Sequence, residues 1–257
     1  MDGVKELTIL QFSLIYILLI IVLIIMKCSG IRKTSFLIVA SMRMTVQLIL
    51  AGLILTYVFD NPHPVFTVVY ILLMTGFAIY TALSQNKGIS RRFKIIAAAS
   101  LGIIGLAVVC FFIMVVVGVS IFDPQYTIPI SGMILGNAMT GMSLGLKSFN
   151  ETVALEQDKI TALLNVGVHP KRIVNPFVNS ALETALLPTM NSMLGMGIIS
   201  LPGMMTGQIL AGTSPSVAIL YQIAIVIAIC AVTCFAVFCA LHLGSRTLYN
   251  KRGQMVH

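Results

Sequence analysis

Long apolar runs alternate along the chain with short polar segments rich in charges, Pro or Gly. The runs reach the roughly 20 residues that an α-helix needs to cross the hydrocarbon core of a bilayer. The pattern predicts seven membrane-spanning helices, at about 7–26, 35–59, 65–83, 95–119, 128–146, 181–199 and 217–243. We therefore expect an all-α, polytopic membrane protein whose single transmembrane domain covers residues 1–257.

The composition supports this expectation. Hydrophobic residues make up 58% of the 257 residues and charged residues only 9%, whereas an ordinary soluble domain carries about 25% charged residues. So few charges cannot cover the surface of a soluble protein of this size. A free soluble enzyme, a nucleic-acid reader and a disordered regulator are excluded.

The basic residues lie on one side of the predicted spans. All but two of the 16 Lys and Arg residues fall between spans 1 and 2, 3 and 4, or 5 and 6, or in the C-terminal tail. The opposite side holds Lys5 with the acids Asp2, Glu6, Asp60 and Asp123. Basic loops stay in the cytoplasm, so we expect the N-terminus outside and the C-terminus inside. The net charge of +8 is then a topology signal and predicts no nucleic-acid partner.

One inward-facing loop, about 147–180, is much longer than the others. It opens with Ser148-x-x-Glu151, a capping-box pattern that predicts a helix over about 149–166. A turn at Gly167–His169 and a second helix over 170–186 are expected to follow, because Gly ends helices and Pro170 suits a first turn. The apolar positions Val153, Ile160, Leu164 and Val168 recur at helical spacing. This pattern fits an amphipathic hairpin on the lipid headgroups as well as a hairpin that docks to a protein.

The residues around the turn favour the docking hypothesis. Thr161-Ala162-Leu163-x-x-x-Gly167 is similar to the Glu-Ala-Ala-x-x-x-Gly loop by which permeases of ABC transporters dock to their ATPase, with Thr161 in place of Glu and Leu163 in place of the second Ala. The resemblance implies that the docking contacts come from Thr161, Ala162, Gly167, His169, Pro170, Lys171 and Arg172.

The segment after span 6 carries a longer motif. It reads Ser-Leu-Pro-Gly-Met-Met-Thr-Gly-Gln-Ile-Leu-Ala-Gly over 200–212, and Leu187-Pro188-Thr189 lies in span 6. The chain resembles the YbbM/FetB-type permeases, whose bacterial members are assigned to iron export and whose plant relatives are linked to aluminium tolerance. The resemblance implies a multi-pass permease of the cell membrane that forms a homodimer and exports a metal ion, iron by resemblance, with ATP hydrolysed by a separate ATPase subunit.

The chain has no nucleotide-binding motif of its own. A phosphate-binding loop needs Gly-x-x-x-x-Gly-Lys-Ser/Thr after a strand, whereas the segment 141–148 has different spacing and lies at the end of a predicted span. We therefore expect a non-catalytic subunit without a cofactor, which relies on ATP bound by a partner chain.

Polar residues inside the predicted spans are candidates for a translocation pathway. Arg43 and Gln47 lie four residues apart in span 2, and Glu183 lies near the start of span 6. Asn137 and Asn191 lie in spans 5 and 6. Charged and amide side chains at this depth usually face a cavity or a partner, although Arg43 could reach the headgroups, Glu183 could be a solvated helix end, and the amides could only join helices.

The Pro and Gly residues of 195–215 predict a broken helix, which marks the pathway in many transporters. Met204 and Gln208 in this segment are therefore further candidates. The 15 Met residues could supply soft thioether ligands or simply fill the core, and the His and Cys residues give no metal-ligand set. A stand-alone secondary transporter of a small solute is the alternative function, although internal repeats and several intramembrane acids are not found.

Overall fold

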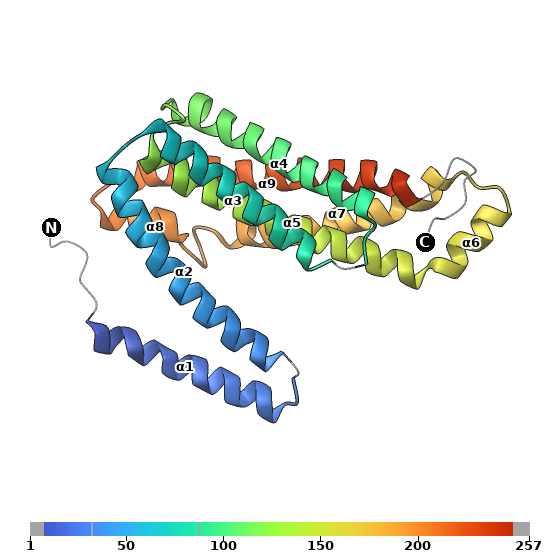
Figure 1. The fold of residues 1–257 in the computed structure, drawn as a ribbon, viewed down its shortest axis with the longest axis horizontal. Coiled ribbons are helices and arrows are strands. Elements are labelled where there is room, and N and C mark those ends of the chain that lie inside the picture. The colour runs from blue at the N-terminus through green and yellow to red at the C-terminus, as the bar shows by residue number, and fades with distance from the viewer. Residues whose placement is uncertain (1–7, 32, 87, 249–257) are drawn as a thin grey trace. The chain divides into compact units, whose positions relative to one another are not determined.

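The computed structural model describes residues 8–31, 33–86 and 88–248. Over these residues the fold is all-α, as the sequence predicts (Figure 1). The helices are α1 (Ile9–Cys28), α2 (Thr34–Asp60), α3 (Pro64–Ser84), α4 (Arg91–Phe111) with the π-helical η1 (Phe112–Val117), α5 (Pro124–Leu155), α6 (Gln157–Asn165), α7 (Pro170–Gly195), α8 (Gly203–Leu210), α9 (Pro215–Ser245) and the 3-10 turn η2 (Arg246–Leu248). Seven residues on which the predicted orientation depends lie outside the described residues: Asp2, Lys5, Glu6, Arg32, Lys87, Lys251 and Arg252.

The chain divides into two compact units, and the first contains α1 and α2. A capping box starts α1: Thr8 Oγ1 accepts from the Gln11 amide at 3.4 Å, and Gln11 Oε1 accepts from the Thr8 amide at 3.1 Å. The hydroxyl groups of Tyr16 and Thr45, 2.7 Å apart, join the two helices. The most apolar stretch of each helix has none of its residues buried. Helices that are apolar on all sides are typical of membrane spans.

The second unit is a bundle of long helices in which α5 is central. It contacts α3, α4, α7 and α9, and α4 packs along α9 (Figure 1). Fully buried side chains from α4, α5 and α9 form much of the core: Leu101, Ile134, Met142, Leu146, Ile225 and Leu241.

Two glycines allow α5 to approach its neighbours closely. A Cβ on Gly141 would overlap the Cγ2 of Thr233, and one on Gly145 would lie 2.8 Å from Val237 Cγ1. We predict from the sequence that Gly132, Gly136 and Gly141 form close helix contacts. That prediction is confirmed for Gly132, where a Cβ would lie 2.9 Å from Met74 Cε, and for Gly141, but Gly136 has open space beside it.

Helices α1, α2, α3 and α9 begin and end within two residues of the predicted bounds. The predicted helix start at Ser148 is wrong, because α5 continues without a break to Leu155. The cause is Phe149, which is buried with Leu146 and keeps the helix packed on the core through a polar stretch of sequence. The broken segment is confirmed: α7 ends at Gly195, and α8 begins only at Gly203.

Five helices of the described chain are long and apolar enough to cross a membrane: α1, α2, α3, α4 with η1, and α9. Helices α5 and α7, which have 32 and 26 residues, are not among these five. They are the more polar helices of the bundle, and each has Pro in its interior. This difference singles out α5 and α7 for a role other than facing lipid.

Candidate translocation site and coupling segment

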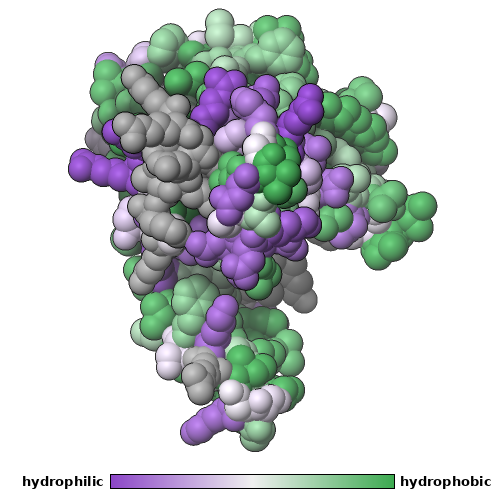
Figure 2. Space-filling model, turned by 90° about the vertical axis from the view of Figure 1, so that its right-hand side faces the viewer, coloured by the Kyte–Doolittle hydropathy of each residue, from purple (hydrophilic) through white to green (hydrophobic). Residues whose placement is uncertain are grey.

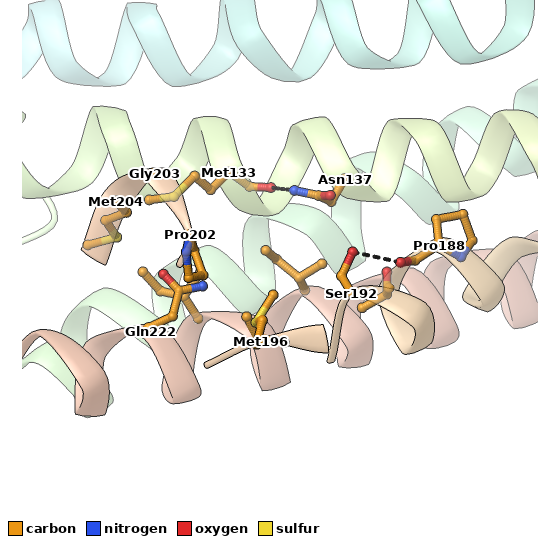
Figure 3. Close-up of a pocket in the computed structure, with 13 residues that line it drawn as sticks. Met133, Asn137, Pro188, Ser192, Met196, Pro202, Gly203, Met204 and Gln222 are labelled. Atoms are coloured by element: carbon orange, nitrogen blue, oxygen red, sulfur yellow. Dashed lines mark hydrogen bonds between the residues drawn. The ribbon is translucent and has the colours of Figure 1, made fainter. Parts of the chain in front are cut away.

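A cavity of about 250 Å³ lies where α5, α7, α8 and α9 meet. Six of its lining residues are Met133, Asn137, Ser192, Met196, Met204 and Gln222 (Figure 3). None of the described residues that line it is charged. The cavity therefore offers amide, hydroxyl and thioether groups without a formal charge.

The break after α7 shapes one end of this cavity. Gly197 has a φ of +83°, a conformation that favours glycine, and a backbone bridge joins Met196 to Ser200. Pro202 then precedes α8 and accepts the first backbone hydrogen bond of that helix, from Thr206 at 3.0 Å. The chain thus turns back toward the bundle and places Met196 and Met204 on the same cavity.

The polar side chains of the cavity are partly held by their own helices. Asn137 Nδ2 donates to the Met133 carbonyl at 2.8 Å, and Ser192 Oγ donates to the Pro188 carbonyl at 2.9 Å (Figure 3). Among the described residues, no hydrogen bond reaches the Oδ1 of Asn137. That oxygen is available to a ligand.

A second cavity of about 560 Å³ adjoins the first and shares Met196, Pro202, Gln222 and Val226 with it. Its other walls are mainly apolar, and among them Ile223 and Ile227 of α9 are exposed. In a bilayer these exposed walls would meet lipid tails. Gln222 therefore lies between the first cavity, which has several polar groups, and the second, which is mainly apolar.

Helix α7 has a buried apolar face, and its exposed polar residues, the α7 stripe, share the opposite face with the exposed apolar residues Leu187 and Leu194. Val178 and Ala185 are buried, whereas Asn179, Glu183 and Asn191 are exposed. An uncovered amide or carboxylate at membrane depth is costly. Wherever such side chains lie in a bilayer, they require water or another protein surface beside them.

The predicted pathway residues do not all meet in one place. Asn137 and Met204 line the 250 Å³ cavity, but Glu183 and Asn191 lie outside it on the α7 stripe. Gln208 lies in α8, and its Oε1 is buried without a hydrogen-bond partner in the described part of the chain. Ser192 and Gln222, which the sequence analysis did not select, also line the cavity.

The other two predicted pathway residues, Arg43 and Gln47, lie on α2 in the first unit. Both are exposed within that unit. Their role in a translocation pathway stays a prediction.

The predicted turn at Gly167–His169 is confirmed, although the helix before it is α6 (Gln157–Asn165) and not one over 149–166. Helix α6 ends with a turn in which Gly167 has a φ of +85°, and the amide of Val168 donates to the Leu163 carbonyl at 3.0 Å. His169 caps α7 by accepting from the Lys171 amide at 3.3 Å. Helix α7 then starts at Pro170, as the sequence predicts.

The apolar face of this corner packs on the protein itself. Ile160 is fully buried, and α6 contacts α7. The other positions predicted for this face, Val153, Leu164 and Val168, are half-buried. Because Ile160 is fully covered and the other three positions are partly covered, this face leaves little apolar surface for lying on headgroups.

The outer side of the corner stays open. Thr161, Ala162, Lys171 and Arg172 are exposed. Leu155 and Val166, at the two ends of α6, keep 86% and 82% of their surface exposed. Figure 2 shows this end of the bundle, where hydrophilic side chains gather.

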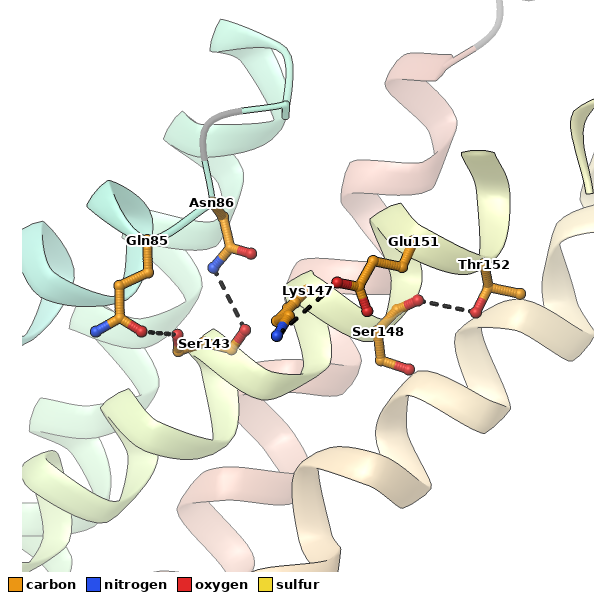
Figure 4. Close-up of polar contacts among 7 residues, drawn as sticks. All are labelled: Gln85, Asn86, Ser143, Lys147, Ser148, Glu151 and Thr152. Carbon is orange, nitrogen blue, oxygen red and sulfur yellow. Dashed lines mark hydrogen bonds and ion pairs between the residues drawn. The ribbon is translucent and has the colours of Figure 1, made fainter. Parts of the chain in front are cut away.

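Hydrogen bonds join α3 to α5 near the same end of the bundle. The buried Asn86 donates through Nδ2 to the carbonyls of Ala82 at 2.9 Å and Ser143 at 3.3 Å, and Ser143 Oγ donates to Gln85 Oε1 at 2.9 Å (Figure 4). One turn further along α5, Lys147 and Glu151 form an exposed ion pair at 3.8 Å. The end of α3 is thereby fixed to α5 on the approach to the corner.

The comparisons with known proteins agree with this architecture. A family model described as "Uncharacterised protein family (UPF0014)" matches residues 9–249. The chain is 34% identical to "UPF0014 membrane protein YjkA" of Bacillus subtilis, over 88% of this chain and 90% of that protein. It is 32% identical to "Probable iron export permease protein FetB" of Escherichia coli, over 83% and 82% of the two chains.

A plant relative extends the same comparison. "Protein ALUMINUM SENSITIVE 3" of Arabidopsis thaliana is 32% identical over 71% of this chain and 66% of that protein. No solved structure matches the chain. The resemblance seen in the Leu-Pro-Gly-Met-Met-Thr-Gly-Gln motif is thus confirmed, and the chain is a multi-pass cell-membrane protein that belongs to the UPF0014 family.

Proposed function

We propose that the chain is the permease subunit of an ABC-type exporter, which works as a homodimer with a separate ATPase subunit. The observation that carries this proposal is that two helices connect the corner directly to the cavity. Helix α5 runs unbroken from Asn137 at the cavity to Leu155 at the corner, and α7 runs from Pro170 at the corner to Ser192 at the cavity. A force on the corner would therefore move two walls of the cavity together.

The seven-span topology is part of the same proposal. Helices α5 and α7 join the five apolar helices as spans, with the N-terminus outside and the C-terminus inside. Within the second unit, the start of α4, the end of α5, the start of α7 and the end of α9 lie at the α6 end of the bundle (Figure 1). Described basic residues gather there: Arg91, Arg92, Lys94, Lys147, Lys159, Lys171, Arg172 and Arg246. Under the positive-inside rule this is the cytoplasmic end.

The polar stripe of α7 supports a dimer. In a bilayer, Asn179, Glu183 and Asn191 need a polar surface opposite them. A second copy that presents the same stripe would enclose a polar path between the subunits. The exported substrate is proposed to be a metal ion, the class to which the name of the E. coli relative points.

Recovery of the ATPase tests the coupling half of the proposal. Leu155→Asp together with Val166→Asp places two charges on the exposed outer side of α6, and we expect it to abolish co-purification of an ATPase from native membranes. Glu151→Ala, which only removes an exposed ion pair one turn before the end of α5, is the control and should retain the partner. If both variants retain the ATPase, the corner is not its docking site.

The alternative, a stand-alone secondary transporter, makes the opposite prediction. Purified chain in vesicles would then move solute down an ion gradient with no ATPase present. Transport that depends on an added ATPase and ATP excludes this alternative.

A further inference from the structure

Three methionine side chains from separate elements line the 250 Å³ cavity. Met133 comes from α5, Met196 follows α7, and Met204 lies in the first turn of α8. In Figure 3, Met133 and Met204 lie at the Gly203 end, and Met196 lies between Gln222 and Ser192 along the cavity. The fold thus brings three thioethers to one space.

These methionines are only partly enclosed by the core: Met133 and Met204 pack against it on one side. Each is half-buried rather than buried, and each borders space that protein atoms leave empty. Met has three rotatable bonds and a polarisable sulfur, so the side chains could swing toward an ion without moving the backbone. Methionines that served only to fill the core would not need to border a cavity.

The other polar groups of the cavity are neutral. The Asn137 Oδ1 accepts no hydrogen bond from the described residues, and Gln222 adds a second amide. Helix α7 ends at the cavity and α8 begins there, so the partial charges of the two helix ends oppose each other. The side chains therefore determine which ion the cavity prefers.

This set of ligands separates metal ions by charge and softness. Hard divalent ions are bound through carboxylates, and Fe(II) sites use His with a carboxylate, but neither group lines the cavity. Thioethers select soft ions such as Cu(I). The cost of burying an ion without a counter-charge also rises with the square of its charge, so a monovalent ion costs about one quarter of what a divalent ion costs.

We propose that this cavity binds a soft monovalent metal cation of the Cu(I) or Ag(I) class through the thioethers of Met133, Met196 and Met204, with the amide oxygen of Asn137 as a further ligand. The inference names the cargo class of the proposed exporter and rests on that function for its role in transport. Binding itself needs only the permease.

The test uses the purified full chain in lipid nanodiscs, with Met labelled by ¹³C at the methyl group. Ag(I), which is stable to oxidation, is titrated as the probe, followed by Cu(I) held with a competing chelator. We expect three methyl signals to shift together at one ion per chain. The methyl signals report on the thioethers alone, so Ag(I) bound by the five free Cys residues does not imitate the result.

Single Leu variants keep the volume of each methionine and identify the three signals. Met133→Leu, Met196→Leu and Met204→Leu should each weaken the binding that shifts the remaining signals by at least about tenfold, since a ligand is lost. Met114→Leu is the control: Met114 lies in η1, is 59% exposed and does not line the cavity, so its loss should change nothing.

Two results would overturn the inference: no methyl shift with Ag(I) or Cu(I), or Fe(II) acting on the same three signals with equal affinity. Ag(I) binding by a chain that recovers no ATPase from native membranes would instead preserve the site and refute the ABC function. ATP-driven transport without Ag(I) binding would preserve the function and refute the site.

Discussion

The hydroxyl of Ser148 on α5 donates a hydrogen bond to the Oγ1 of Thr184 on α7 at 3.3 Å. This contact lies between the α6 corner and the cavity. One turn earlier along α5, a Cβ on Gly145 would lie 3.2 Å from the Cβ of Ala185. The two helices are therefore joined by a polar contact and by close packing, and they are expected to move as one body when the corner is pushed.

The packing of α5 on α9 predicts a clash that can be rescued. Gly141→Ala should lower the free energy of unfolding by about 1–3 kcal/mol, the usual cost of overpacking, because the new methyl overlaps the Cγ2 of Thr233. Adding Thr233→Ser removes that methyl group and should restore part of the loss. Thermal unfolding of the purified protein measures both variants.

Gly136→Ala is the matched control for this prediction, because Gly136 has nothing within 4 Å of the position that a Cβ would take. It should be no less stable than the parent protein, because Ala suits a helix interior better than Gly. Equal destabilisation by Gly136→Ala and Gly141→Ala would show that the close contact with α9 is not the cause.

The turn at the corner predicts a separation of ATP hydrolysis from transport. Gly167→Val places a β-branched residue at a φ of +85°, which costs about 1–2 kcal/mol or more and distorts the turn. With the ATPase partner present, we expect ATP hydrolysis to persist while transport falls, and membrane insertion to be unchanged. Reconstituted vesicles measure both rates.

Gly118→Val imposes the same strain after η1, where φ is +77°, but far along the chain from the corner. Its ratio of transport to ATP hydrolysis should match that of the parent protein. If both variants change the ratio alike, general strain and not the corner is responsible.

The junction of α3 with α5 predicts unequal effects for two neighbouring amides. Asn86→Ala should destabilise the protein by about 1–3 kcal/mol, because buried carbonyls lose their donor. Gln85→Ala, at an exposed residue that accepts one hydrogen bond from Ser143, should cost no more than about 1 kcal/mol. Urea or thermal unfolding compares the two, and equal losses would contradict the role given to Asn86.

The polar stripe of α7 predicts a loss of transport without a loss of stability. Asn191→Leu removes an exposed amide that makes no contact with the core, so the unfolding temperature should hold or rise. Transport should fall if the stripe faces the path. Leu187→Met, an exposed apolar exchange on the same helix, is the control, and unchanged transport in Asn191→Leu would remove that residue from the pathway.

The sequence predicts most of the helices because a bilayer demands long apolar runs, and those runs are visible without a structure. It fails at Ser148, where Lys147, Asn150 and Glu151 make the segment look like a loop. Phe149 is buried in the core and carries α5 through these polar residues. Which residues a helix buries depends on its neighbours, and local sequence does not contain that information.

The candidate site is predicted only in part for a similar reason. Asn137 and Met204 could be selected because they are unusual or lie in a broken segment. Ser192 and Gln222 meet them only through the packing of α7 and α9. Gln222 could have been selected from the sequence, because it is a lone amide in an apolar helix and such a residue usually has a hydrogen-bond partner.

The central claim is that the α6 corner faces the cytoplasm and receives force from a partner. A membrane-impermeant thiol reagent applied to intact cells tests its location most directly, using Val166→Cys on the exposed corner and Gln125→Cys at the exposed start of α5 as the outward control, both in a chain with Cys28→Ser. The account predicts that Gln125→Cys is labelled in intact cells and that Val166→Cys is labelled only after the membrane is opened. Labelling of Val166→Cys in intact cells would contradict it.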